Sequence, residues 1–101
     1  MKKYIIKVDG QRNLAFTGEE IANASTRNNL STRWFVLTLY KTKGENYIAQ
    51  RQGYSQWQGE ETNHEAKKCE TDEQVVEYFG LSEAAKDLYD QAGIIHETDV
   101  D

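Results

Sequence analysis

The feature that most constrains the fold is the stretch from residue 33 to residue 57, RWFVLTLYKTKGENYIAQRQGYSQW. It holds six of the eleven aromatic residues and divides into two apolar runs around Lys43-Gly44. Runs rich in aromatic and β-branched residues, separated by a short segment that contains glycine, are typical of a β-hairpin. Both strands of this hairpin are apolar on both faces, so one face can be left over for a partner.

The length of the turn decides which side chains share a face of the hairpin. A two- or four-residue loop centred on residues 43–44 places Leu39 opposite Ile48 and Tyr40 opposite Tyr47. A three-residue loop with the glycine in a bulge would shift the pairing by one residue and place Leu39 opposite Tyr47. We expect the first register, because it matches apolar residues better.

The expected register divides the hairpin into an aliphatic face and an aromatic face. The aliphatic face holds Phe35, Leu37, Leu39 and Ile48. The aromatic face holds Trp34, Val36, Thr38, Tyr40, Tyr47, Ala49 and Arg51, and Trp57 joins it unless a bulge intervenes. The aliphatic face is the natural core, and the aromatic face is the candidate binding surface.

The N-terminal part predicts further strands. Residues 3–8 alternate in polarity, with Tyr4, Ile6 and Val8 facing inward. The turn dipeptide Asp9-Gly10 follows, and residues 12–17 read as a returning strand with Leu14 and Phe16 on one face.

Residues 18–26 fit two structures. A capping box at residues 17–20 would start a helix, whereas a bulge at Gly18 would let the strand continue to about Thr26 and return Ile21 to the inner face. We expect the strand, because the helical segment is short and ends in poor helix formers. Residues 62–69 read as an exposed or edge strand whose lysines discourage edge-to-edge pairing.

Two short helices close the chain. Thr71 and Gly80 bracket one of them, and Ser82 and Gly93 bracket the other, as N-terminal and C-terminal caps. Both are too short to form in isolation, so they require packing on the sheet. The chain therefore predicts a single α+β domain over residues 1–101. Residues 1–69 are mostly β, an antiparallel sheet of four to five strands, and two short helices at 70–95 pack on the aliphatic face.

Composition narrows the class of protein. The 101 residues contain one cysteine, no proline and no apolar run near the ~20 residues that span a bilayer. The first residues, MKKYIIKV, lack the apolar stretch of a signal peptide, so we expect a cytoplasmic protein. Residues 1–68 carry eleven basic and seven acidic residues, whereas residues 69–101 carry one lysine and ten acidic residues. That acidic third could face a basic partner as an inhibitor that mimics DNA does.

No enzyme is expected. The chain contains no G-x-S-x-G, H-E-x-x-H, Walker or Rossmann motif. His64 and Cys69 are the closest metal-ligand candidates, but their odd spacing on a strand points them to opposite faces. Cys69 precedes a helix N-terminus, which can lower a thiol pKa, yet an inert structural cysteine is the simpler interpretation. We expect no cofactor and no metal.

The predicted function is therefore binding or regulation through the aromatic face. Aromatic residues around an arginine are what protein interfaces prefer, and the partner is another protein or a second copy. Single-stranded nucleic acid is the alternative, since the same residues could stack bases and neutralise phosphates. A third interpretation is that the N-terminal strands or residues 17–26 cover this face and make it a second core layer. The candidate binding residues are Arg33, Trp34, Tyr40, Tyr47, Arg51 and Trp57.

Overall fold

The computed structural model describes residues 1–28, 30–57, 59, 61–98 and 100. It confirms the α+β class, with an antiparallel five-stranded sheet followed by two helices that pack on it. The strands are β1 (Lys2–Ile6), β2 (Leu14–Ser25), β3 (Arg33–Thr42), β4 (Tyr47–Ser55) and β5 (Asn63–Cys69), and the helices are α1 (Asp72–Phe79) and α2 (Glu83–Ala92). None of the described helices is long and apolar enough to cross a membrane.

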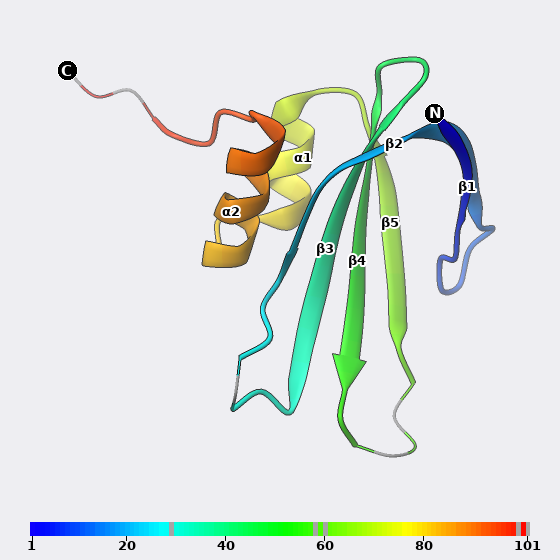
Figure 1. Cartoon of the computed structure of the whole chain (residues 1–101), viewed down its shortest axis with the longest axis vertical. Coiled ribbons are helices and arrows are strands. Elements are labelled where there is room, and N and C mark those ends of the chain that lie inside the picture. Colours follow the sequence, from blue (N-terminus) through cyan, green and yellow to red (C-terminus); the bar gives the residue numbers. More distant parts are fainter. Residues whose placement is uncertain (29, 58, 60, 99, 101) are drawn as a thin grey trace.

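The sheet is a meander in which each strand pairs with the next along the chain, and it curls into a half-barrel (Figure 1). The curl depends on β2, which pairs with β1 over its first half and with β3 over its second half. The expected strand over residues 18–25 is confirmed and the helical alternative is excluded. The bulge, however, lies between Glu20 and Ala22 rather than at Gly18.

Gly18 has a different role from the predicted one. It lies where β2 crosses the end of β3, and a Cβ there would overlap the carbonyl oxygen of Lys41 and approach the Cα of Thr42 to 2.9 Å. Ile21 also departs from the prediction, because it packs with the helices and not with Leu14 and Phe16. The bulge thus turns the second half of β2 toward the opposite face of the sheet.

The register of the β3–β4 hairpin differs from both registers expected from the sequence. Leu39 lies opposite Ala49, Tyr40 opposite Ile48 and Lys41 opposite Tyr47. The turn contains residues 43–45 and is closed by hydrogen bonds between Thr42 and Asn46 (N–O 2.8 Å) and from the Glu45 N–H to the Thr42 carbonyl oxygen (2.9 Å).

The residue with positive φ in this turn is Glu45 (64°), not Gly44. Non-glycine residues visit that region less often, and here the turn and the side-chain oxygen of Thr42, which accepts from the Asn46 N–H, hold it there. A shift of one residue exchanges the faces of β4 relative to β3. Ile48 therefore joins the face of Tyr40, while Tyr47, Ala49 and Arg51 join the face of Leu37 and Leu39.

The two faces of the sheet support two apolar cores. The larger lies under the helices and is built on Leu39, Ala49, Val75, Leu88 and Tyr89, all fully buried. The smaller lies inside the curl, where Ile6, Tyr40 and Ile48 are buried against the half-buried Tyr4, Leu14, Phe16 and Ala66. The middle of the sheet is consequently covered on both sides.

The helices begin and end where the sequence predicts. The side chains of Thr71 and Ser82 accept hydrogen bonds from the Gln74 and Ala85 N–H groups, and Gly80 and Gly93 follow the last helical residues with positive φ. The short connection between the helices is held by the buried Tyr89, whose hydroxyl donates to the Gly80 carbonyl oxygen at 2.6 Å.

Candidate functional site

The lower ends of β3 and β4 extend beyond both the helices and the β1–β2 hairpin (Figure 1). Large apolar side chains are exposed there, with 47% of Phe35 and 53% of Trp57 accessible. We call this region the uncovered end, and it consists of Arg27, Arg33, Trp34, Phe35, Tyr54 and Trp57. Its two faces carry different arrangements of side chains.

On the face opposite the helices, Arg27, Trp34 and Tyr54 form a ladder across three neighbouring chain segments. Tyr54 lies directly opposite Trp34 on β4, with the two rings stacked at 6.0 Å between centroids and 17° between planes. Arg27 follows β2 on the other side of β3, and its guanidinium lies 4.2 Å from the centre of the Trp34 ring. Such a ladder orders the side chains, because stacking and cation–π contacts each favour one geometry.

On the helix-side face, Phe35 lies beside Gly53, its partner on β4. A Cβ on this glycine would come within 3.4 Å of the Phe35 ring, so its absence leaves a shallow hollow beside an exposed aromatic side chain. Arg51 reaches the same place, with its guanidinium 5.6 Å from the centre of the Phe35 ring. A hollow of about 360 Å³ joins this face to Trp34 and Tyr54 around the edge of the hairpin.

Arg33 and Trp57 complete the uncovered end. Arg33 begins β3 opposite Ser55, is exposed, and lines the same hollow. Trp57 lies just past β4 in a bend that the hydrogen bond from its N–H to the Ser55 hydroxyl oxygen stabilises at 3.0 Å. It therefore does not extend the aromatic face as a strand residue.

The structure does not bring the six candidate residues onto one face, because the hairpin register differs from the expected one. Trp34 and Tyr40 lie on the face opposite the helices, and Tyr47 and Arg51 lie on the helix-side face. Three of the candidates, Arg33, Trp34 and Trp57, are at the uncovered end. The other three are engaged within the fold.

Tyr40 is buried inside the curl. Only 7% of it is exposed, and its hydroxyl donates to the Gln50 side-chain oxygen at 3.0 Å. Its ring packs against those of Tyr4 and Phe16 at 4.8 and 5.3 Å between centroids. Burial is the main cause that raises the pKa of Tyr40, with a further contribution from Glu20. The third interpretation made from the sequence, a face covered by the N-terminal strands, is thus correct for this residue.

Tyr47 and Arg51 connect the sheet to α1. The Tyr47 hydroxyl donates to Asp72 at 2.8 Å, and burial together with this hydrogen bond raises the pKa of Tyr47 to about 12. Arg51 donates to the Tyr78 carbonyl oxygen at 3.2 Å and lies 3.8 Å from Glu65. Its guanidinium is also 5.5 Å from the centre of the Tyr78 ring, so it anchors the end of α1 to β4.

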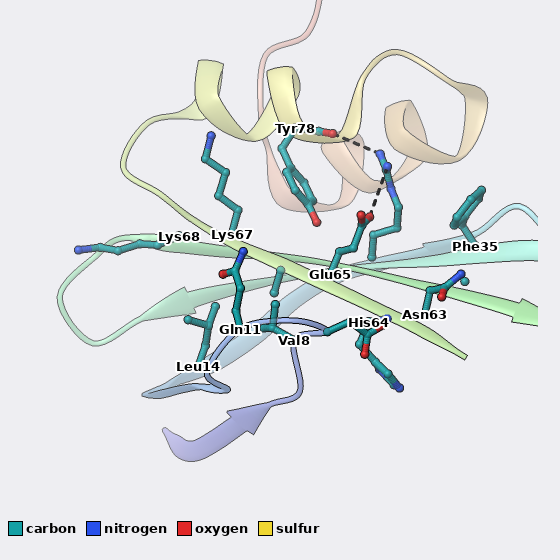
Figure 2. A pocket seen from close by; sticks show the side chains of 14 residues that line it. Val8, Gln11, Leu14, Phe35, Asn63, His64, Glu65, Lys67, Lys68 and Tyr78 are labelled. Atoms are coloured by element: carbon teal, nitrogen blue, oxygen red, sulfur yellow. Dashed lines mark hydrogen bonds and ion pairs between the residues drawn. The ribbon is translucent and has the colours of Figure 1, made fainter. Parts of the chain in front are cut away.

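A second concave region, which the sequence did not reveal, follows β5. A hollow of about 850 Å³ runs along both sides of this strand, with Gln11, Leu14 and Val8 on one side and Lys67 and Tyr78 on the other (Figure 2). The Tyr78 hydroxyl and the His64 Nδ1 are buried without a hydrogen-bond partner in the described part of the chain. This hollow forms only when β5 pairs with β4 and the turn around residue 9 approaches β5.

The side chains considered as metal ligands or nucleophiles are His64, Cys69 and their acidic neighbours. Within residues 1–28, 30–57, 59, 61–98 and 100, no three histidine, cysteine, aspartate or glutamate side chains gather to hold a metal. Cys69 is fully buried under the helices, and burial raises the pKa of its thiol despite the opposing effect of Lys67. Because the thiolate is the reactive form, this burial disfavours the reactive state of Cys69.

Comparison of the chain with protein-family models, with curated proteins and with solved structures found no match. Functional inference for this chain therefore rests on its own geometry.

Proposed function

We propose that this chain is a small non-enzymatic binding protein that contacts another protein through the uncovered end. The observation that carries the proposal is that Phe35 and Trp57 remain about half exposed while equally large side chains in the middle of the same sheet are buried. Exposed aromatic side chains beside arginines are typical of protein interfaces and of their energetically dominant residues.

The geometry of the ladder favours a protein partner over single-stranded nucleic acid. Bases bind to proteins by stacking on free aromatic faces. Trp34 is flanked by Tyr54 from β4 and by Arg27 from the β2 side, so its two neighbours already compete for its ring faces. Phe35 and Trp57 supply apolar area instead, which suits contact with apolar side chains of another protein.

Two substitutions test the proposal. Phe35→Ala and Trp57→Ala remove exposed apolar area, so they should leave folding nearly intact and weaken self-association or partner binding at least about tenfold, which corresponds to 1.4 kcal/mol. Leu81→Ala is the matched control, because Leu81 is 59% exposed in the turn between the helices and lies outside the uncovered end.

Sedimentation equilibrium of the purified chain measures self-association, and cross-linking in cells followed by mass spectrometry identifies other partners. The proposal predicts contacts that Leu81→Ala preserves and that the other two variants lose. If all three variants keep the same partners and the same mass as the wild type, the uncovered end is not an interface.

A titration with labelled single-stranded DNA and RNA at low and then moderate salt separates the two function classes. Salt-sensitive binding that Trp34→Ala or Tyr54→Ala abolishes would support the nucleic-acid alternative.

A further inference from the structure

The open edge of β5 lies beside an apolar groove on the concave side of the curled sheet. From the adjoining hollows of about 850 and 430 Å³, we infer that this seam binds an extended acidic segment of another protein as an added strand. Phe35 of the uncovered end also lines the larger hollow. The strand edge, the apolar floor and the lysines that carry the inference lie outside the uncovered end, so the inference does not depend on the proposed function.

The backbone of β5 has unused hydrogen-bonding groups. His64 directs both its N–H and its carbonyl away from β4, to the side-chain oxygen of Asp9 at 2.8 Å and the Asp9 N–H at 2.9 Å. Alternate residues of an antiparallel strand bond to the same side, and the pairing of β5 with β4 has no register shift. Ala66 and Lys68 therefore direct their N–H and carbonyl groups outward as His64 does.

The hydrogen bonds of the β3–β4 turn indicate independently that Ala66 and Lys68 direct their backbone groups outward. Thr42 and Asn46 form a hydrogen-bonded pair, so the even-numbered residues of β4 bond to β3 and its odd-numbered residues bond to β5. The residues of β5 opposite those odd-numbered positions are 65, 67 and 69. Asp9 bonds to His64 on the open side of β5, but no backbone group of the described residues bonds to Ala66 or Lys68 on that side.

The groove beside this edge has an apolar floor. The two hollows share Leu14 and Lys68, and between them they are lined by Phe16, Ile48 and Ala66, all members of the core inside the curl. The Asp9 turn closes one end of the groove. An added strand would place every second side chain over this floor while its backbone pairs with the edge.

The charged side chains beside the groove indicate which kind of segment would bind there. Lys43 and Lys68 line the smaller hollow, and none of the described residues that line it is acidic. In the larger hollow, Asp9 already accepts the His64 N–H, and Glu65 lies on the other face of the strand beside Arg51. Lysines on an edge strand oppose pairing with an identical edge, since like charges would meet, but they favour an acidic segment. An acidic partner therefore fits this seam better than a second copy.

The test uses the whole chain and a synthetic acidic peptide in which alternating valine and threonine residues are followed by a run of glutamates, so that valines cover the floor and glutamates reach Lys43 and Lys68. The charge control, called the lysine–valine peptide, has lysines in place of the glutamates. In the free protein, the amides of Ala66 and Lys68 should exchange with solvent faster than those of Glu65 and Lys67, which bond to β4. The acidic peptide should slow exchange at Ala66 and Lys68 at least about tenfold and leave Glu65 and Lys67 unchanged.

Two neighbouring lysines supply the matched variants. Lys68→Glu should weaken peptide binding at least about tenfold, and Lys67→Glu should have little effect, because its side chain lies on the helix side of β5. Lys68→Pro removes an outward N–H that is not used within the sheet, so the fold should survive while strand addition is lost.

Four results would overturn the inference. The first is the absence of acidic-peptide binding at low salt, the second is equal binding of the lysine–valine peptide, and the third is an equal effect of the two glutamate variants. The fourth is protection of Ala66 and Lys68 in the free protein together with dimer formation, which would assign the edge to a second copy.

Discussion

Strand β3 passes through two different environments. From Leu37 onward, Leu37, Leu39 and Tyr40 are buried, because the helices cover one face of the sheet and the β1–β2 hairpin covers the other. In its first half, Trp34 is half-buried and Phe35 is exposed. Residues 33–36 and residues 37–42 each contain three apolar side chains, so the difference shows that burial here depends on which elements reach each part of the sheet.

The largest expected contrast within this strand is between Leu39→Ala and Phe35→Ala. Leu39 is fully buried, so its truncation should lower the free energy of unfolding by about 2–5 kcal/mol through lost burial and a residual cavity. Phe35→Ala should cost less than about 1 kcal/mol, since half of the side chain is already in water. Urea unfolding of both variants measures the difference. Equal losses would mean that the uncovered end is part of the core.

Two strand glycines allow the same comparison between the covered and the uncovered part of the sheet. Gly18→Ala should destabilise the chain by about 1–3 kcal/mol or more, because the new methyl group meets backbone atoms of β3 that cannot move freely. Gly53→Ala at the uncovered end should be nearly neutral, as its Cβ would make ordinary contacts with Phe35 and Asn63. Thermal unfolding compares the two variants, and a neutral Gly18→Ala would contradict the close crossing of β2 over β3.

A smaller contrast involves two tyrosine hydroxyls. Tyr40→Phe removes the donor to the buried Gln50 side-chain oxygen and should cost about 1–3 kcal/mol. Tyr54→Phe keeps the ring that stacks on Trp34, so stability should change by less than about 0.5 kcal/mol. Denaturant titration of the two variants provides the measurement. A neutral Tyr40→Phe would show that water satisfies Gln50.

The last predicted effect is the loss of stability when the buried tyrosines ionise, which is absent at neutral pH and develops only in alkali. Burial raises the pKa of Tyr47, Tyr78 and Tyr89 to about 12, from 10.0. A raised pKa means that folding favours the neutral phenol, so the stabilisation is complete below about pH 10 and is lost as the pH rises through about 12. Phenolate absorbance and circular dichroism should therefore change together over that interval. Ionisation of all tyrosines without loss of structure would contradict their burial.

Much of the secondary structure could be predicted from local residues. The caps Thr71, Ser82, Gly80 and Gly93 act within one turn of each helix, so their neighbours alone specify them. Alternation identified Tyr4, Ile6 and Val8 as inward residues of the first strand, and the lysines of residues 62–69 indicated an edge. Boundaries were less accurate, since the first strand ends at Ile6 and the second begins at Leu14.

The candidate site was harder to predict, because it depended on the hairpin register. That register followed from the positive φ of Glu45 and the hydrogen bonds of Thr42, whereas the expected register was chosen because it matched apolar residues better. An error of one residue exchanged Ile48 with Tyr47 and Arg51 between faces. The seam beside β5 could not be foreseen, since it joins residues near position 9 to residues near position 64.

The sequence by itself predicted an antiparallel sheet of four to five strands and two capped helices, because those signals are local. Only the tertiary structure decided which aromatic side chains are accessible. The bulge at Ile21 folds the β1–β2 hairpin over one face, the helices cover the other, and neither reaches the lower ends of β3 and β4 (Figure 1). Phe35 and Trp57 consequently remain about half exposed. Burial is a property of distant segments brought together, so the composition of residues 33–57 could suggest a candidate binding surface but not which residues would form it.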